Sequence, residues 1–256
     1  MCGIAGLITR NGTADEFIPR VKAMVDEQRH RGPDDEGIEV PHRENPVIIF
    51  GHRRLAIIDL SPAGHQPMCD PDTGNWIVFN GEIYNFKELR SELEKVGYVF
   101  RTRTDTEVIL KAYACWGGGC VHRLRGIFAF AICQMVNGQS KTASLQLFLA
   151  RDQLGVKPLY YWLDNDMLLF ASEVRALLAS GLVPRRMDLS GLRSWLAYGS
   201  VQEPYTLVHG VRSLLPGHML IWRADKFLAI AIGNYHRPRR SKLNVRLIYL
   251  NRWVIA

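Results

Sequence analysis

The second residue of the chain, Cys2, is the residue whose position most directly suggests chemistry. It follows Met1 and precedes GIAGLIT, a short apolar run typical of a β-strand. If Met1 is removed, Cys2 carries a thiol and a free α-amino group, so one residue supplies a nucleophile and its own base. The α-amino group, with an ordinary pKa of about 7.7–8.0, can then relay a proton near neutral pH. The alternative is a structural cysteine that leads a strand and packs as a small hydrophobe.

Four other stretches are more polar than core packing requires. Three of them contain glycine, namely RHRGPDDEG (29–37), GHRRLAIIDLS (51–61) followed by HQPM, and FNGEIYN (79–85), whereas the fourth, RTDTE (103–107), is polar without glycine. The last of them places an acid at the start of a predicted helix. Hydrolysis of an amide needs a nucleophile, a proton acceptor, donors for the oxyanion and groups that hold the charged ends of the substrate.

In this order along the chain, nine motifs resemble the glutamine-hydrolysing domain of class II glutamine amidotransferases, of the asparagine synthetase type. They are MCGIAG, RHRGPD, GHRRLAIIDLS, HQP, FNGEIYN, TDTEVIL, GIFAFAI, RDQLGVKPLYY and FASEVRALL, and the resemblance covers residues 2 to about 222. The GHRRL and NGEIYN regions favour the asparagine synthetase branch over relatives that make amino sugars or purines. The resemblance implies that glutamine is hydrolysed to glutamate and ammonia through a thioester on Cys2. The ammonia would supply ATP-dependent asparagine synthesis from aspartate.

The resemblance also implies roles for individual residues. Cys2 would be the nucleophile, and the Asn80 side chain with the Gly81 backbone N–H would form the oxyanion hole. The substrate-binding residues would be Arg54 for the α-carboxylate of glutamine, Asp105 and Glu82 for its α-ammonium, and Ile57. A planar guanidinium suits a carboxylate because it can donate two parallel hydrogen bonds.

Each of these residues has a structural alternative. Asn80 and Gly81 could make a hairpin turn, for which NG is a common dipeptide. Asp105 could serve only to cap a helix, with Thr104 and Glu107 in a capping box. Arg54 could form a solvated pair with Arg53.

Five other residues near these motifs could be mistaken for catalytic groups. His30, His52 and His65 are more simply explained as residues that order loops, since the resemblance assigns none of them as a base. Lys157 and Glu173 are interpreted as contacts to a following domain or as internal ion pairs.

Charge and cysteine content narrow the class of protein. Of the net charge of +7, six positive charges lie between Tyr235 and the end of the chain, so the rest is nearly neutral and does not predict a nucleic-acid groove. No secretory signal pattern is expected because the first apolar run ends at Arg10, and no window has the roughly 18 apolar residues of a membrane span. Five cysteines without a paired CxxC suggest neither disulfides nor a metal site, and a reduced Cys2 suggests the cytoplasm.

Short apolar runs rich in β-branched and aromatic residues predict strands. These runs are GIAGLIT, VIIFG, RLAIIDL, WIVFNG, GIFAFAI, LQLFLAR and MLLFAS. Helices are predicted over about 17–29, from Asn85 to near Gly97, and from Thr104 to before Gly117, with two more after Ser172 and Asp188. Many strands with few helices between them favour two stacked antiparallel sheets covered by helices. The resemblance implies the same α+β fold, the four-layer αββα sandwich of N-terminal nucleophile hydrolases.

We expect a glutaminase domain over 2–222 and a divergent basic tail, or the start of a synthetase domain, over 223–256. No cofactor is expected for the glutaminase domain. ATP and Mg²⁺ would serve a synthetase domain, whose SGGxDS-type loop does not occur in this sequence. The expected partners are glutamine and a synthetase domain or chain that receives ammonia, with a homodimer left open. Three alternatives remain open: an amidase for another amide, an amidotransferase of this family with another ammonia acceptor, and a non-catalytic regulatory homologue.

Overall fold

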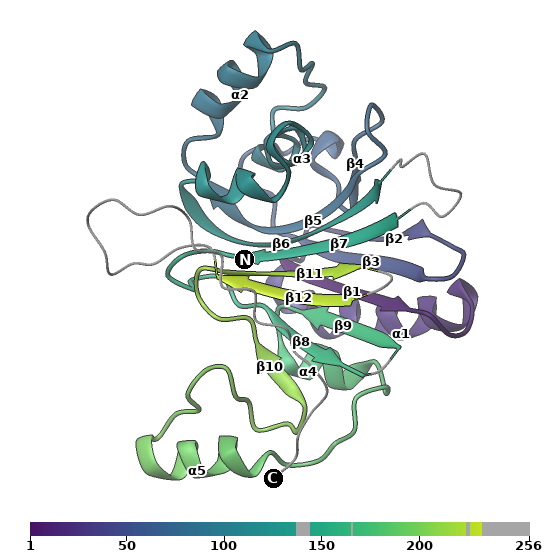
Figure 1. The fold of residues 1–256 in the computed structure, drawn as a ribbon, viewed down its shortest axis with the longest axis vertical. Helices are drawn as coiled ribbons and strands as arrows, with labels where there is room; N and C mark the ends of the chain where they lie inside the picture. The colour runs from purple at the N-terminus through teal and green to yellow at the C-terminus, as the bar shows by residue number, and fades with distance from the viewer. Residues whose placement is uncertain (137–143, 165, 224–225, 232–256) are drawn as a thin grey trace.

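Residues 1–136, 144–164, 166–223 and 226–231 are those that the computed structural model describes. Their strands form two six-stranded sheets, and every pair of neighbouring strands is antiparallel. The two sheets stack face to face, with helices on the outer side of each (Figure 1). This is the four-layer αββα arrangement that the sequence predicts.

The first sheet is built around the strand that follows Cys2. Its order is β10 (Val211–Ser213), β8 (Tyr160–Leu163), β9 (Met167–Ala171), β1 (Gly3–Thr9), β3 (Val47–Arg54) and β2 (Asp35–His42). Strand β1 is central and all seven of its residues are buried, which explains its unbroken apolar sequence. It pairs with β3 from Gly3 onward and with β9 from Ala5 onward, so Cys2 lies just beyond both ladders.

The second sheet carries the NGE motif in an inner strand. Its order is β12 (Lys226–Ala231), β11 (His218–Arg223), β7 (Ser144–Arg151), β6 (Gly126–Val136), β5 (Trp76–Ile83) and β4 (Met68–Cys69). In the pairing of β5 with β6, Asn80 lies opposite Ala129 and Gly81 opposite Phe128. The predicted boundary at residue 222 stays a prediction, and the basic tail from Tyr235 lies outside the described residues.

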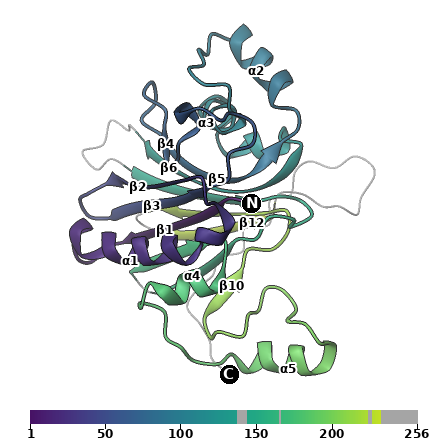
Figure 2. The same cartoon turned by 180° about the vertical axis from the view of Figure 1, so that it is seen from behind.

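Three hydrophobic clusters hold the four layers together. Alternate residues of β1 belong to two different clusters. Ile4 and Ile8 face the second sheet and belong to the cluster between the sheets, whereas Ala5 and Leu7 belong to the cluster between the first sheet and its helices. Helices α1 (Ala14–Glu27) and α4 (Val174–Ala179) cover that outer face of the first sheet (Figure 2). Helices α2 (Phe86–Lys95) and α3 (Asp105–Trp116) cover the second sheet through the third cluster, and α5 (Leu189–Tyr198) lies beyond β10 (Figure 1).

The helix predictions are confirmed in position. Asn85 is the N-cap residue of α2, but its side chain makes no capping bond. The Asn85 side chain instead donates a hydrogen bond to the carbonyl of Arg123 and accepts one from the N–H of Arg125. These bonds connect the start of α2 to the segment that precedes β6. Thr104 does cap α3, since its hydroxyl accepts a hydrogen bond from the Glu107 N–H.

One strand prediction is wrong. RLAIIDL was expected to form a strand, but β3 ends at Arg54 and the chain then enters a loop in which Ile57, Ile58 and Leu60 are exposed. The neighbouring strands provide the reason: β1 reaches only Gly3 opposite Arg53, and β2 reaches only Asp35 opposite Arg54. Beyond Arg54 no strand remains on either side to pair with the backbone. The other six predicted strands are confirmed as β1, β3, β5, β6, β7 and β9.

Among the described residues, no helix has the combination of length and apolar character that crossing a membrane requires.

Candidate active site

The seven residues singled out in the sequence line a single cavity of about 160 Å³ at the N-terminal end of β1. They are Cys2, Arg54, Ile57, Asn80, Gly81, Glu82 and Asp105. They come from the start of β1, the end of β3 and the loop after it, the end of β5, and the first turn of α3. The fold therefore brings together residues from both sheets and from a helix of the outer layer.

The Cys2 thiol is half-buried and held by one residue of the loop after β3. The Leu55 N–H donates to Sγ at 3.3 Å, and Sγ lies 3.6 Å from the Leu55 carbonyl oxygen. Burial raises the pKa of the Cys2 thiol above its ordinary value. The Leu55 N–H, the amino terminus and the cationic groups of Arg54 and Lys157 act in the opposite direction.

Met1 also lines the cavity and is 55% exposed. Met1 is joined to Cys2 through the nitrogen that would become the free α-amino group if Met1 were removed. Removal of Met1 would therefore open the cavity and place a basic amine beside the thiol at the same time.

Asn80 is 1% exposed, and its Nδ2 has no hydrogen-bond partner in the part of the chain that the structure describes. It lies within β5, so the hairpin-turn alternative for Asn80 and Gly81 is wrong. A buried amide without a partner costs about 1–3 kcal/mol. The described residues leave this donor unused, on a residue that lines the cavity.

Gly81 is required by close packing between β5 and β6. A Cβ atom at this position would lie 2.3 Å from the carbonyl oxygen of Ile127 and 2.8 Å from the Cα of Phe128. Only glycine fits so near the neighbouring backbone. The small residue also leaves its own backbone open to the cavity beside Asn80.

His52 joins the two sheets next to these residues. Its Nε2 lies 3.0 Å from the carbonyl oxygen of Phe79, the residue before Asn80, so Nε2 carries the proton and donates it to that carbonyl. Burial lowers the pKa of His52 to about 4, so the ring is neutral at pH 7. His65 and His30 instead face the carboxylates of Asp35 and Glu173. These contacts agree with the interpretation that the histidines order the surrounding structure.

The two adjacent arginines at the end of β3 point to opposite sides, as alternate residues of a strand do. Arg54 lines the cavity, and the loop over 59–64 encloses its guanidinium, which donates to the carbonyls of Asp59 and Ser61. Gly64 lies so close that a Cβ there would meet Arg54 Nη2 at 1.9 Å. Arg53 pairs with Asp26 and Glu36 away from the cavity. Both side chains are buried, so the solvated-pair alternative is wrong.

Asp105 is the first residue of α3, and Thr104, not Asp105, caps the helix. Its Oδ2 accepts a hydrogen bond from the Ile83 N–H at 3.0 Å, and the residue is 5% exposed. Burial raises the pKa of Asp105 to about 6; backbone N–H groups oppose the shift, and the charge of Glu82 adds to it. Glu82 is itself exposed at the cavity rim, as is Ile57. The two carboxylates together make this side of the cavity acidic.

The raised pKa of Asp105 predicts a pH-dependent stability. Between about pH 4 and pH 6 the folded protein binds more protons at this residue than the unfolded chain, so the free energy of unfolding should fall as pH rises. Asp105→Asn removes this titration and keeps the size of the side chain. We expect urea unfolding at pH 4 and pH 7 to show that the variant gains about 2 kcal/mol relative to the wild type at the higher pH. A difference that does not change with pH would contradict this.

Gln66, Thr106 and Lys157 are among the cavity residues to which the sequence motifs assigned no substrate role. Gln66 is buried; its Oε1 accepts from the Phe79 N–H at 2.7 Å and its Nε2 reaches the Thr106 hydroxyl at 3.4 Å. Lys157 is presented by a tight loop in which Asp152 accepts hydrogen bonds from the N–H groups of residues 154, 156 and 157. Each of the three belongs to one of the nine motifs, HQP, TDTEVIL or RDQLGVKPLYY. Membership in these motifs was the sequence feature that could have indicated a place in the cavity.

A search of solved structures supports the fold class. The chain superposes with a TM-score of 0.63 on glutamine phosphoribosylpyrophosphate amidotransferase from B. subtilis, complexed with ADP and GMP, at 19% sequence identity. The match covers 91% of this chain and 49% of that structure. With its two stacked antiparallel sheets between helices and a thiol at the start of a central strand, the protein has the fold of N-terminal nucleophile hydrolases.

The sequence comparisons then identify the family. The sequence model of the family described as "Glutamine amidotransferase domain" matches residues 1–235, so the chain belongs to this family. It is 36% identical over 228 residues to "Asparagine synthetase [glutamine-hydrolyzing] 3" of Bacillus subtilis, covering 88% of this chain and 35% of that protein. It is 35% identical to "Amidase chry2" of Gibberella zeae, covering 88% of this chain and 33% of that protein. The chain thus spans about a third of the length of these relatives.

Proposed function

We propose that the chain hydrolyses glutamine to glutamate and ammonia in this cavity, with Cys2 as the nucleophile. The observation that carries the proposal is that Asn80, whose buried amide nitrogen has no partner among the described residues, lines the same cavity as Cys2. A donor left unpaired in the resting protein is available to an oxyanion that develops during the reaction.

The proposed chemistry uses two groups of one residue. The Cys2 thiol gives its proton to the α-amino group, and the thiolate attacks the carboxamide carbon of glutamine. The carbonyl electron pair moves to oxygen, where the Asn80 amide and the Gly81 N–H stabilise the negative charge. The C–N bond then breaks, ammonia leaves with the proton from the α-ammonium, and a thioester on Cys2 remains. Water hydrolyses the thioester, which releases glutamate and restores the thiol.

The remaining cavity residues would recognise glutamine by its charged ends. The Arg54 guanidinium retains N–H groups beyond the two that bind the loop carbonyls, and these would hold the α-carboxylate. Asp105 and Glu82, on the acidic side, would hold the α-ammonium, with Ile57 at the rim. This arrangement would favour free glutamine over a glutamine residue in a peptide, whose ends carry no charge.

The ammonia would supply the synthesis of asparagine, as the names of two Bacillus subtilis relatives suggest. The family resemblance implies that aspartate is the acceptor and that ATP drives the reaction. ATP and Mg²⁺ would serve that synthetase partner. The relative named as an amidase favours a second candidate, an amidase of this family that acts on another amide. A cytoplasmic location would keep Cys2 reduced. A homodimer stays a prediction.

The proposal predicts that mature, active protein lacks Met1 and that one thiol reacts with a glutamine-like electrophile. Intact-mass measurement should give the mass of the chain without methionine. A diazo-ketone analogue of glutamine should label Cys2 and spare the other four cysteines, because its carboxylate and ammonium direct it to the cavity. Retention of Met1 in active protein would contradict the use of the α-amino group as base. A folded protein with free Cys2 that forms no glutamate would favour a non-catalytic role.

A further inference from the structure

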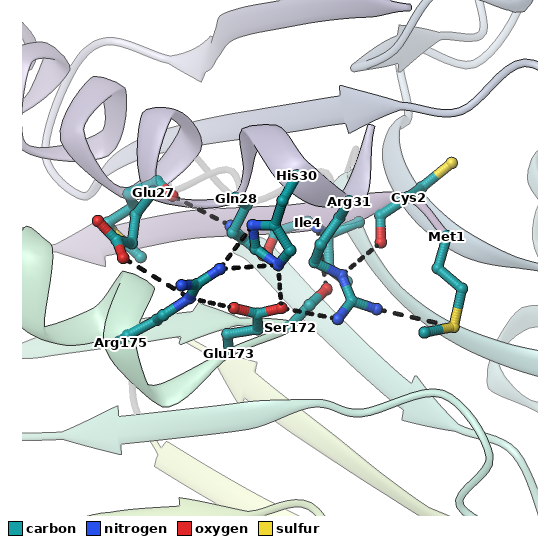
Figure 3. A network of polar contacts seen from close by, with 11 residues as sticks. Met1, Cys2, Ile4, Glu27, Gln28, His30, Arg31, Ser172, Glu173 and Arg175 are labelled. Atoms are coloured by element: carbon teal, nitrogen blue, oxygen red, sulfur yellow. Dashed lines mark hydrogen bonds and ion pairs between the residues drawn. The ribbon is translucent and has the colours of Figure 1, made fainter. Parts of the chain in front are cut away.

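A second polar cluster lies beside the cavity and is centred on Glu173, at the start of α4 (Figure 3). Its Oε1 accepts a hydrogen bond from Arg31 Nη1 at 2.8 Å and lies 2.8 Å from His30 Nε2. Its Oε2 accepts from Arg175 Nε at 2.6 Å. Burial raises the pKa of Glu173, but hydrogen bonds from Arg31, Arg175 and His30 outweigh it and lower the pKa to about 2. The carboxylate is therefore ionised throughout the working pH range.

Arg31 connects this cluster to the nucleophile. Its side chain is 8% exposed, and its Nε donates to the carbonyl oxygen of Cys2 at 3.0 Å. Figure 3 shows the guanidinium lying between the Cys2 carbonyl and the Glu173 carboxylate. The two contacts use different N–H groups of one rigid plane, so the position of the carboxylate determines where Nε points.

The residue before Glu173 holds the next part of the same strand. The Ser172 N–H donates to the Ile4 carbonyl at 2.9 Å, and the Ser172 hydroxyl accepts from the Ile4 N–H at 3.0 Å. The ladder of β1 with β9 starts only at Ala5. On the side of β9, residues 172 and 173 together with Arg31 therefore restrain the chain before Ala5, while β3 pairs with it on the other side from Gly3 onward.

We propose that Glu173 is a positioning residue for the nucleophile and acts through Arg31. This inference rests on the proposed function, since it assigns Glu173 to the reaction of Cys2. Glu173 does not line the cavity and cannot touch glutamine there. Its contacts with Arg175 and His30 involve half-exposed side chains, and such exposed pairs contribute little to stability. Its contact with the buried Arg31 fixes the carbonyl of Cys2, and hence the direction in which the thiol and the α-amino group leave the backbone.

Loss of this restraint should lower kcat more than it changes KM, because misplacing a reacting group by about 1 Å can cost up to about 100-fold in rate. We expect Glu173→Ala to lower kcat about 10- to 100-fold with KM nearly unchanged. Glu173→Gln keeps an oxygen that accepts from Arg31 and should lose less. The matched control is Arg175→Met, which removes a partner of Glu173 that does not contact Cys2 and should leave kcat unchanged.

A double-mutant cycle tests whether Glu173 acts through Arg31. Glu173→Ala should cause no further loss of kcat when it is added to Arg31→Ala, because the connecting guanidinium is already absent. Losses that multiply in the double variant would overturn the proposal, and so would full activity of Glu173→Ala. If the wild type itself does not hydrolyse glutamine, the proposed function fails. This outcome can be distinguished from the two outcomes that overturn the positioning role of Glu173, because both of them require an active wild type.

A spectroscopic readout tests the same inference without activity. Cys2 is the only cysteine in the chain that is followed by glycine. Protein made with ¹³C-carbonyl cysteine and ¹⁵N-glycine therefore gives one carbonyl–amide correlation signal, that of the Cys2–Gly3 peptide. This signal should move in Glu173→Ala toward its position in Arg31→Ala and stay in place in Arg175→Met. A signal that Glu173→Ala leaves at the wild-type position would overturn the proposal.

Discussion

Replacing Asn80 with alanine is expected to lower kcat for glutamine hydrolysis by about 10²- to 10³-fold, because one of two oxyanion donors is lost. KM should change little, since the oxyanion exists only in the transition state. The free energy of unfolding should not fall, because Asn80 Nδ2 has no hydrogen-bond partner in the described residues that the substitution could break. Steady-state kinetics and urea unfolding of the same preparation would measure both effects.

Two further variants make this prediction specific. Arg54→Ala should mainly raise KM, because a group that holds the α-carboxylate contributes equally before and during the reaction. Asn11→Ala removes an exposed amide that binds Asp166 outside the cavity, and it should leave kcat unchanged. A folded Asn80→Ala variant with wild-type kcat would remove Asn80 from the oxyanion hole. A large fall in kcat for Arg54→Ala with KM unchanged would exchange the two roles.

The largest loss of stability is expected from Lys111→Met, in the buried face of α3. Lys111 is 1% exposed, and its ammonium contacts the carboxylates of Asp70 at 2.7 Å and Asp72 at 2.6 Å. Burial favours a lower pKa of Lys111, but these two carboxylates outweigh it and raise the pKa, so the ammonium stays charged. Its removal would leave the buried Asp70 carboxylate without its cation, which typically costs about 3–5 kcal/mol.

Urea unfolding at pH 7 would measure this loss, with Lys95→Met as the matched control. Lys95 is exposed at the end of α2, so its replacement should change the free energy of unfolding by less than about 0.5 kcal/mol. Adding Asp70→Asn to Lys111→Met should recover part of the loss, because the unpaired charge disappears. A Lys111→Met variant as stable as the Lys95→Met control would show that the ion pair contributes nothing to the fold.

The local elements of this protein could be predicted from its sequence because each depends on neighbouring residues. Strand β1 lies in a buried layer and is apolar from Gly3 to Ile8. Helix α3 is capped by a threonine at its start and by a glycine with φ +57° at its end. The types of residue that could hydrolyse an amide were also visible, since Cys2 and the NGE motif stand out in short, polar, glycine-containing stretches. The resemblance to a known family then selected among them.

Other properties depended on residues distant in the chain, and the sequence left them open. RLAIIDL has the composition of a strand, yet it forms a loop because neither β1 nor β2 extends far enough to pair with it. Asn80 and Gly81 resemble a turn, yet they lie inside β5 because β6 runs alongside them.

The contacts of charged residues likewise depended on the tertiary structure and not on the local sequence. Nothing local distinguishes Arg54, which lines the cavity, from Arg53, which pairs with Asp26 on the other side. Glu173 was interpreted as a contact to another domain or as an internal ion pair, and the structure shows it paired with Arg31, 142 positions away. The sequence by itself thus determined which groups exist and where the five helices and six of the strands lie. Only the tertiary structure decided which of these groups share the cavity of Cys2, because burial and charge pairing depend on neighbours that the fold alone brings together.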